Sequence, residues 1–335
     1  MNQLNLGPRA SQNRNRNFRR LDGIKVDRMT KTLALREQGE LCYTISPFTE
    51  PRITIDSGES LVVETEDAFS GQIRKEGDRR DTKSVPYPNP LSGPIFVEGA
   101  RPGGTLAVKI VEITPLIGQG ATRILPWWWF YTQPGTSTMN RLFLAELPHG
   151  TRICKITDRK VLFSDRVILP YRPMIGTIGT APQLQAVLSN DPGPHGGNLD
   201  LPDVTEGNTI YLPVQVEGAL LHLGDVHAIQ GEGEFSGAGI EMPARVTISV
   251  SVLNEKRISW PRIETPSKIA SVACTGPGRD LKDAIHLAFS ELILWLSSDY
   301  GMDKWEAYQL CGMVSKVQVG NIWTVGVSFP KEYLV

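Results

Sequence analysis

The chain has 335 residues, of which 40% are hydrophobic and 21% are charged, a composition typical of a soluble globular protein. Because its 35 basic and 36 acidic residues nearly cancel, it has no overall field that would attract nucleic acid or an anionic membrane, and we expect neither as a partner. It has no apolar stretch long enough to span a membrane, and its four cysteines lack C-x-x-C spacing, so we expect a cytoplasmic protein without a disulfide framework.

The first predicted feature is a disordered basic arm over residues 1–22. Its first twenty residues carry five arginines and no acid, and they offer too little apolar surface to offset the entropy of ordering them. We expect residues 23–335 to form a single folded unit, with room for two β-rich lobes over about 23–185 and 186–335.

Strand patterns dominate from about residue 40 onward. Five segments alternate or run apolar, are rich in β-branched residues, and are bounded by Gly, Pro, Asn or Asp. They are residues 52–67, 105–113, 208–216, 244–253 and 317–329. The 32 glycines and 24 prolines supply the turns between them.

Two helices are predicted near the C-terminus. Asp280 can cap the first, whose apolar residues recur at three- and four-residue spacing until Gly301 ends it. Asp303 and Glu306 have the spacing of a capping box for the second, which we expect to end at Gly312. The pair is expected to cover a sheet. Strands first and helices late favour a β-rich α+β fold over alternating βαβ units.

Residues 126–135, "PWWWFYTQPG", place three tryptophans, a Phe and a Tyr between two prolines. Such a cluster is typical of a core or an oligomer interface. It is also suited to the wall of a substrate pocket, because Trp and Tyr supply rigid apolar area with a polar tip. Both interpretations remain open for Trp127, Trp128 and Trp129.

Residues 221–234, "LHLGDVHAIQGEGE", concentrate side chains that can bind metal. In an extended strand Asp225 and His227 project from the same face, and Glu232 and Glu234 again share a face. Carboxylates with an imidazole are ligands of Zn²⁺, Mn²⁺ or Fe²⁺, and a spare glutamate could act as general base. The alternative is a pair of half-buried histidines beside solvated turn glutamates.

Two further segments carry candidate residues, although each alone is more typical of an ordinary turn. His195 precedes two glycines and Asn198, whose amide could orient a carbonyl group. Asp67 ends a strand at a predicted turn. Several common catalytic motifs are missing from the sequence, which has no G-x-S-x-G, no Walker A and no H-E-x-x-H.

With these residues identified, the chain resembles the acetamidase/formamidase family. The resemblance rests on residues 89–113, 176–182, 195–241 and 306–334, and it extends from about residue 40 to the end. It implies hydrolysis of a small carboxamide to a carboxylate and ammonia. It also implies a homo-oligomer and the family's fold, with several mixed sheets and a C-terminal helical pair.

The resemblance also implies roles for individual residues. Asp67, His195, Asp225 and His227 match the positions expected to hold a divalent metal, which we predict to be zinc, with manganese or iron as alternatives.

The resemblance also covers two expected catalytic residues, Glu234 as general base and Glu241 in the same block. The oxyanion role is our own interpretation, in which Asn198 or the glycine amides beside it bind the developing oxyanion.

Two departures from the family pattern bear on the substrate. Position 232 is Glu where the pattern usually has Asp, and the tryptophan run is unusual. We therefore predict a pocket that includes Trp127, Trp128, Trp129 and Glu232, and a substrate larger or more aromatic than acetamide. The rival hypotheses are a non-haem iron oxygenase with a two-His-one-carboxylate set, and a β-rich binding module stabilised by a cation.

Overall fold

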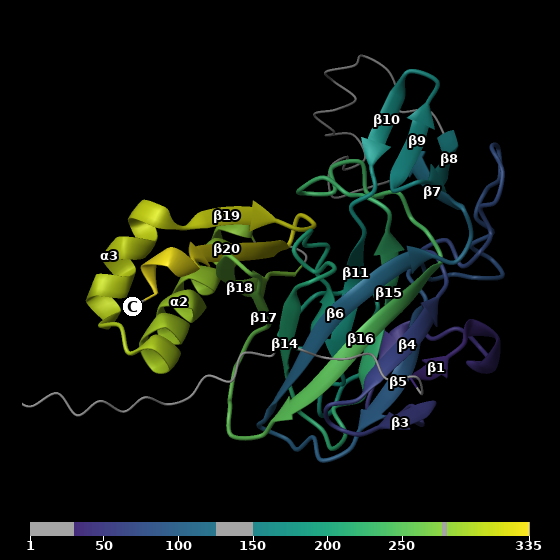
Figure 1. The fold of residues 1–335 in the computed structure, drawn as a ribbon. Helices are drawn as coiled ribbons and strands as arrows, with labels where there is room; N and C mark the ends of the chain where they lie inside the picture. The colour runs from purple at the N-terminus through teal and green to yellow at the C-terminus, as the bar shows by residue number, and fades with distance from the viewer. Residues whose placement is uncertain (1–29, 125–149, 277–279, 335) are drawn as a thin grey trace, which may run out of the picture.

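The computed structural model describes residues 30–124, 150–276 and 280–334 (Figure 1). The predicted arm over residues 1–22 and the tryptophans at 127–129 lie outside these ranges. Within them, no helix is both long and apolar enough to cross a membrane. The division of residues 23–335 into two lobes stays a prediction.

The largest sheet of the described residues has nine strands. Its edge pair β1–β4 is parallel, and the other neighbours are antiparallel. In spatial order the strands are β1 (Lys31–Leu33), β4 (Ser60–Thr65), β16 (Ala244–Leu253), β6 (Thr105–Pro115), β14 (Thr209–Pro213), β17 (Arg262–Glu264), β18 (Lys268–Cys274), β20 (Thr324–Pro330) and β19 (Lys316–Val319). Strands β6 and β16 form the long diagonal ribbons of Figure 1, and β19 and β20 lie beside the helices.

A second sheet, which has five strands in the described ranges, packs against the first. Its order is β13 (Gly196–Asn198), β11 (Met174–Thr180), β15 (Leu221–His227), β5 (Leu91–Val97) and β3 (Ile53–Ile55). One buried apolar cluster contains residues of both sheets, among them Ile110 and Ile248 from the first and Ile178 and Leu223 from the second. Every residue of β11 and β15 is buried, so polar side chains on these strands lie inside the protein.

Two smaller sheets complete the β structure of the described chain. The strands β10 (Val167–Pro170), β9 (Lys160–Ser164), β8 (Gly150–Thr157) and β7 (Gln119–Ile124) form the antiparallel sheet at the top of Figure 1. The pair β2 (Thr44–Ile45) and β12 (Val187–Leu188) is also antiparallel. Single 3-10 turns occur at Leu35–Glu37 and Lys331–Tyr333.

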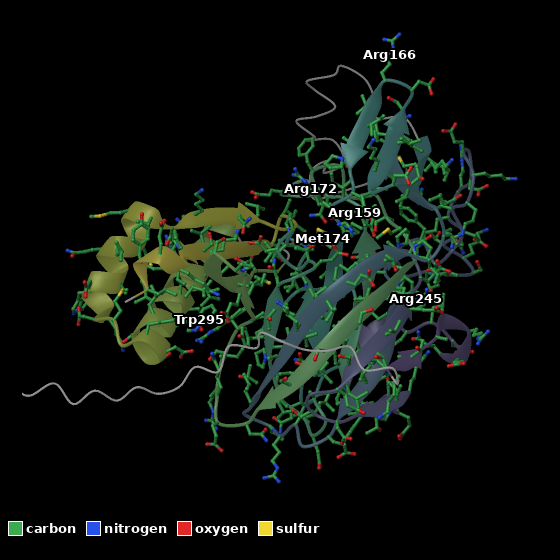
Figure 2. The ribbon with its side chains drawn as sticks, viewed as in Figure 1. Arg159, Arg166, Arg172, Met174, Arg245 and Trp295 are labelled. Carbon is green, nitrogen blue, oxygen red and sulfur yellow. The ribbon has the colours of Figure 1, made fainter. Side chains whose placement is uncertain are left out.

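The C-terminal helices α2 (Leu281–Tyr300) and α3 (Lys304–Val314) cover the end of the large sheet formed by β18 and β20. Trp295 on α2 is buried between helix and sheet (Figure 2), and its ring lies 6.4 Å from that of Tyr211 on β14. Gly301 ends α2 in the left-handed conformation, with φ 71°. The Asp303 side chain caps α3 by accepting from the amides of Trp305 and Glu306.

The β-rich α+β fold with mixed sheets and a helical pair is confirmed, but three predicted boundaries were wrong. Helix α3 does not end at Gly312, because the chain stays helical to Val314, which packs against the helical core. Segment 52–67 is two strands separated by a turn at Gly58, and segment 317–329 is the hairpin of β19 and β20.

Candidate active site

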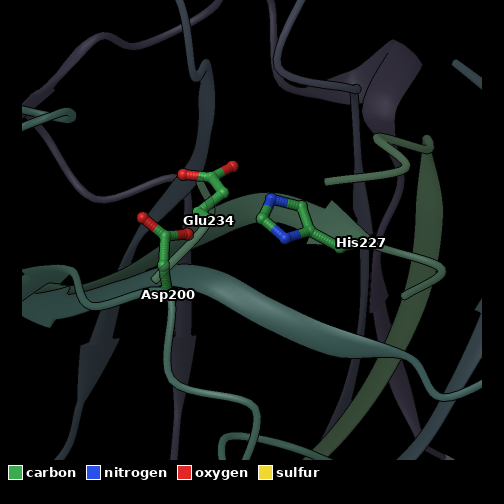
Figure 3. Close-up of side chains that lie close together, drawn as sticks. All are labelled: Asp200, His227 and Glu234. Carbon is green, nitrogen blue, oxygen red and sulfur yellow. The ribbon is translucent and has the colours of Figure 1, made fainter. Parts of the chain in front are cut away.

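Within the described ranges, four acidic side chains surround one imidazole near the end of β15. Together with this imidazole, they form two sets that share His227. One set is Asp200, His227 and Glu234, and the other is Asp225, His227 and Glu241. In each set, one donor atom per residue lies within 4.8 Å of the others. Figure 3 shows the first set, with both carboxylates on the same side of the imidazole ring. Glu234 is half-buried, and the other four side chains are at most 3% exposed.

His227 lies at the centre of the cluster. Its Nε2 is 3.3 Å from Asp225 Oδ1 and 3.0 Å from Glu241 Oε2. Glu241 comes into range because its backbone bridges antiparallel to His227. Burial alone would lower the pKa of His227, but the charges of Glu241 and Asp225 raise it well above its ordinary value. The imidazole is therefore in a strongly negative environment.

The backbone of Gly239 positions two of the acids. Its N–H donates to Glu234 Oε1 and to Glu241 Oε1, each at 3.0 Å. The His227 ring packs against the same residue, because a Cβ at Gly239 would lie only 2.8 Å from Nδ1 of that ring. A side chain at position 239 would therefore displace the imidazole.

Gly176 on β11 lets the other two acids approach. A Cβ at this position would lie 2.6 Å from Asp200 Oδ1 and 2.7 Å from Asp225 Oδ2. The carbonyl of Gly176 also accepts from the amides of Leu199 and Asp200, which fixes the chain that carries Asp200. Both carboxylates thus occupy space that any other residue at 176 would fill.

Three of the acids have a backbone conformation that residues other than glycine rarely adopt. The φ angles are 49° at Asp200, 55° at Asp225 and 42° at Glu234. Left-handed backbone at non-glycine residues is uncommon and collects at binding and catalytic sites, where the surrounding structure holds it. At Asp225 this interrupts the regular strand, although Gly224 and Val226 on either side pair with β11.

A polar framework holds Asp225 and Asn198 together. The Asn89 amide donates to Asp225 Oδ2 at 2.8 Å, and Thr177 Oγ1 lies 2.7 Å from Asn198 Oδ1 and 3.1 Å from Asp225 Oδ2. On the other side, Asn321 Nδ2 donates to Asp200 Oδ2 at 3.1 Å and to the backbone carbonyl of Asn198 at 2.7 Å. Since the carbonyl end of the Asn198 amide is engaged, its nitrogen remains available as a donor.

Burial and mutual repulsion disfavour the ionised form of the carboxyl groups. Burial and the neighbouring Asp225 charge raise the pKa of Asp200 and of Glu241 to about 7. Burial and the charge of Asp200 likewise raise the pKa of Glu234. Three buried atoms, Asp200 Oδ1, Glu241 Oε2 and His227 Nδ1, have no well-aligned hydrogen bond in the described structure. Glu241 Oε2 is close to His227, but the contact is poorly directed.

These features fit a divalent cation. Carboxylates and imidazole are ligands of Zn²⁺, Mn²⁺ and Fe²⁺, and donor atoms around a tetrahedral ion with bonds near 2 Å lie about 3.3 Å apart. The spacings of His227 Nε2 to its two carboxylate neighbours, 3.0 and 3.3 Å, match that separation. A cation would also offset the negative charge that raises the pKa of His227.

The cluster opens into a cavity of about 210 Å³. This is below the roughly 300 Å³ at which pockets for drug-sized ligands begin, so it suits a small substrate. Its lining includes Asn198, Asp225, Glu234 and Glu241, together with Phe69, Arg80, Asn89 and Arg123.

Other sequence-predicted residues lie outside both donor sets. The Asp67 carboxylate accepts from the amides of Phe69 and Gly71 and pairs with Arg74. His195 is buried with its Nε2 unpartnered among the described residues, and burial lowers its pKa to about 4.

Of the predicted pocket residues, only Glu232 lies within the described ranges, and it does not line this cavity. Glu232 is exposed, and its carboxylate lies 3.4 Å from Gln318 Nε2, away from the cavity lining. Trp127, Trp128 and Trp129 fall in the range that the structure does not describe.

Sequence reasoning missed Asp200, which closes the first donor set, and the framework residues Asn89, Thr177 and Asn321. Asp200 stands two residues after Asn198 in a segment already rich in candidates. Nothing local distinguishes it from a turn aspartate, because its partners come from β11, β15 and the β19–β20 hairpin.

Comparison with known proteins identifies the family and the relatives that the chain resembles. Residues 35–191 and 186–330 match the Acetamidase/Formamidase family. A putative formamidase of Schizosaccharomyces pombe is 29% identical over 266 residues, which are 62% of each chain. An acetamidase of Mycolicibacterium smegmatis is 31% identical over 255 residues, 60% of this chain and 63% of that one. The matched region thus spans less than two thirds of these curated relatives.

Solved structures extend the likeness over nearly the whole fold. An acetamidase from Yersinia enterocolitica has a TM-score of 0.83 and 36% identity, covering 92% of this chain and 93% of that one. An acetamidase from Bacillus halodurans has a TM-score of 0.79 and 30% identity, covering 91% and 98%. By sequence and by fold, the chain belongs to the acetamidase/formamidase family.

Proposed function

We propose that this protein hydrolyses a small linear carboxamide to a carboxylate and ammonia, with a divalent metal ion at His227. The observation that supports this best is the buried cluster in which carboxylates surround a single imidazole beside a small cavity. Such a concentration of buried acids is unstable without a cation, because each ionised carboxylate loses hydration. Family membership supports amide hydrolysis as the reaction.

Asp225, His227 and Glu241 are the residues that would hold the metal, with Asp200 next to them. Bound there, a divalent ion supplies a nucleophilic water at neutral pH and polarises a carbonyl group. We retain zinc as the proposed metal, with manganese and iron as alternatives, because one imidazole with carboxylates suits all three.

His195 and Asp67 stay proposed ligands by resemblance alone. For Asp67, the existing pair with Arg74 argues against a place at the metal.

Glu234 is the proposed general base. Glu234 lines the cavity, the residue as a whole is half-buried, and the Gly239 amide donates to its carboxylate. From this position it can take a proton from the attacking water and deliver it to the departing nitrogen. That transfer is needed because an amide anion is a very poor leaving group.

Asn198 is the proposed oxyanion donor. Thr177 and Asn89 engage its carbonyl oxygen, so the amide nitrogen is free to donate into the cavity that Asn198 lines. A donor held in advance by its neighbours stabilises developing charge without reorganising during the reaction.

Ammonia release from a panel of small amides tests this function, with Glu234→Gln as the key variant. We expect turnover to fall by about a hundredfold or more in Glu234→Gln, since the loss of a general base typically costs that much, while the fold is retained. Glu232→Gln is the matched control, because Glu232 is exposed and outside the cavity lining. Oxygen consumption without ammonia would instead indicate an oxygenase, and ligand binding without turnover would indicate a binding module.

A further inference from the structure

Two arginines form a second, basic wall of the proposed substrate cavity. Arg80, in the loop between β4 and β5, and Arg123, on β7, line the same cavity as Asn198 and Glu234. Both arginines are half-buried. The lining of the cavity therefore combines carboxylates of the acidic cluster with two guanidinium groups.

Neither guanidinium is neutralised by a carboxylate in the described part of the chain. Arg80 Nη2 donates to the carbonyl of Val85 at 3.0 Å, and its Nε is buried without a partner among described residues. Arg123 lies over the ring of Phe69, 5.7 Å from the centroid. Arg74, which is close in sequence to Arg80, instead pairs with both Glu66 and Asp67. Acids are thus available nearby, but they are engaged elsewhere.

The two cations also repel one another. Burial lowers the pKa of both side chains, and the charge of Arg123 lowers that of Arg80 further. Bringing two like charges together in a partly desolvated wall is unfavourable unless an anion completes the site. Guanidinium groups suit a carboxylate in particular, because their planar N–H donors match its two oxygens.

We propose that Arg80 and Arg123 bind a carboxylate of the substrate, so that the amide hydrolysed is the monoamide of a short dicarboxylic acid. This rests on the proposed amidase function. In the described part of the chain neither arginine forms an ion pair with the acids around His227, so both guanidinium groups remain available to an anion at the end of the substrate that does not react. Water and the monoamide give the dicarboxylate and ammonia. Phe69, which also lines the cavity, supplies apolar contact for the intervening carbon chain.

Matched substrates test the proposal. Succinamate, butyramide and β-alaninamide have similar length and carry a carboxylate, a methyl group and an ammonium group, respectively, at the end remote from the amide. We expect kcat/KM for succinamate to exceed that for butyramide by about tenfold or more, as a charge-assisted hydrogen bond provides, and β-alaninamide to be the poorest. Equal kcat/KM for succinamate and butyramide would overturn the carboxylate site and leave the amidase function intact.

Variants locate the preference. Arg80→Gln and Arg123→Gln should each reduce the succinamate-to-butyramide ratio by about tenfold. Arg123→Lys, which keeps the charge, should retain part of the ratio even if the glutamine variants fold poorly. Arg101→Gln is the matched control, because Arg101 is exposed and lies outside the cavity lining, and it should leave the ratio unchanged. An unchanged ratio in both glutamine variants would contradict the assignment.

Calorimetric binding separates this proposal from the amidase function. If no amide in the panel is hydrolysed, the proposed reaction fails, but succinamate binding can still be measured. Tight binding to the wild type that weakens in Arg123→Gln and survives in Arg101→Gln supports the basic wall. Absence of succinamate binding to the wild type overturns it.

Discussion

Gly176 and Gly239 allow the acidic side chains to reach His227. The first makes room for the carboxylates of Asp200 and Asp225, and the second packs on the imidazole while its amide holds two glutamates. At these positions a single methyl group would occupy space that the acidic cluster now fills.

Gly176→Ala should therefore damage the site more than the fold. The added Cβ would overlap two carboxylates, and a displacement of about 1 Å at a catalytic group can reduce turnover by about a hundredfold. We expect a loss of stability of about 1–3 kcal/mol from overpacking, measured by urea denaturation, alongside the fall in ammonia release. Wild-type turnover in a folded Gly176→Ala protein would show that Asp200 and Asp225 do not need their present positions.

Part of the cluster could be predicted from local sequence. Two-residue spacing in a strand anticipated that Asp225 and His227 meet, and their side chains do lie 3.3 Å apart. The left-handed backbone at Asp225 was not anticipated, because strand periodicity carries no signal for it. Asp200 could not be found from local sequence. It reaches His227 only because β11 contacts the segment that carries Asp200 and also pairs with β15, which carries His227.

Among the elements, α3 differs most instructively from its prediction. Glycine commonly ends a helix by adopting the left-handed conformation, as Gly301 does after α2. Gly312 remains helical because apolar contacts of Leu310 and Val314 with the helical core continue past it. Tertiary packing of α3 therefore outweighed the tendency of Gly312 to end the helix.

Gly312→Ala should stabilise the protein. Gly312 is exposed in helical backbone, and an added Cβ would meet no atom within 4 Å. Alanine loses less backbone entropy on folding, so we expect a gain of up to about 1 kcal/mol in the free energy of unfolding, with amidase activity unchanged. Urea denaturation measures this, and a loss of stability would mean that the helix does not run through this position.

The same contrast between local signal and tertiary context applies to the strands. Periodicity predicted strand content in all five segments, but it merged β3 with β4 and β19 with β20. Turns at Gly58 and near Asn321 separate them, and the two halves of segment 52–67 join different sheets. Sheet membership is a property of long-range pairing, which periodicity does not encode.

At the scale of the whole molecule, the packing of the two large sheets buries β15 completely, and a histidine with it. His222 has no exposed surface, its Nδ1 lies 3.0 Å from the carbonyl of Leu220, and burial lowers its pKa to about 4. It is therefore neutral in the folded protein across the physiological range.

This burial makes folding sensitive to acid. In the unfolded chain the pKa of His222 is near 6.5, so between pH 6.5 and 4 the unfolded state binds a proton that the folded state lacks. Stability is fully present above pH 6.5 and falls as the pH is lowered, by about 2 kcal/mol at pH 5. His222→Gln should remove that part of the loss in urea denaturation at pH 7 and pH 5. Equal losses in both proteins would contradict the buried neutral state.

The metal at His227 is the central claim for the whole protein, and metal content measured together with ammonia release tests it most directly. We predict that the purified protein contains a divalent metal, and that a chelator removes metal and ammonia release together. Adding back zinc, manganese or ferrous iron should restore both. His227→Gln should lose both, while the exposed His286→Gln control keeps them. Undiminished ammonia release from protein without measurable metal would contradict the account.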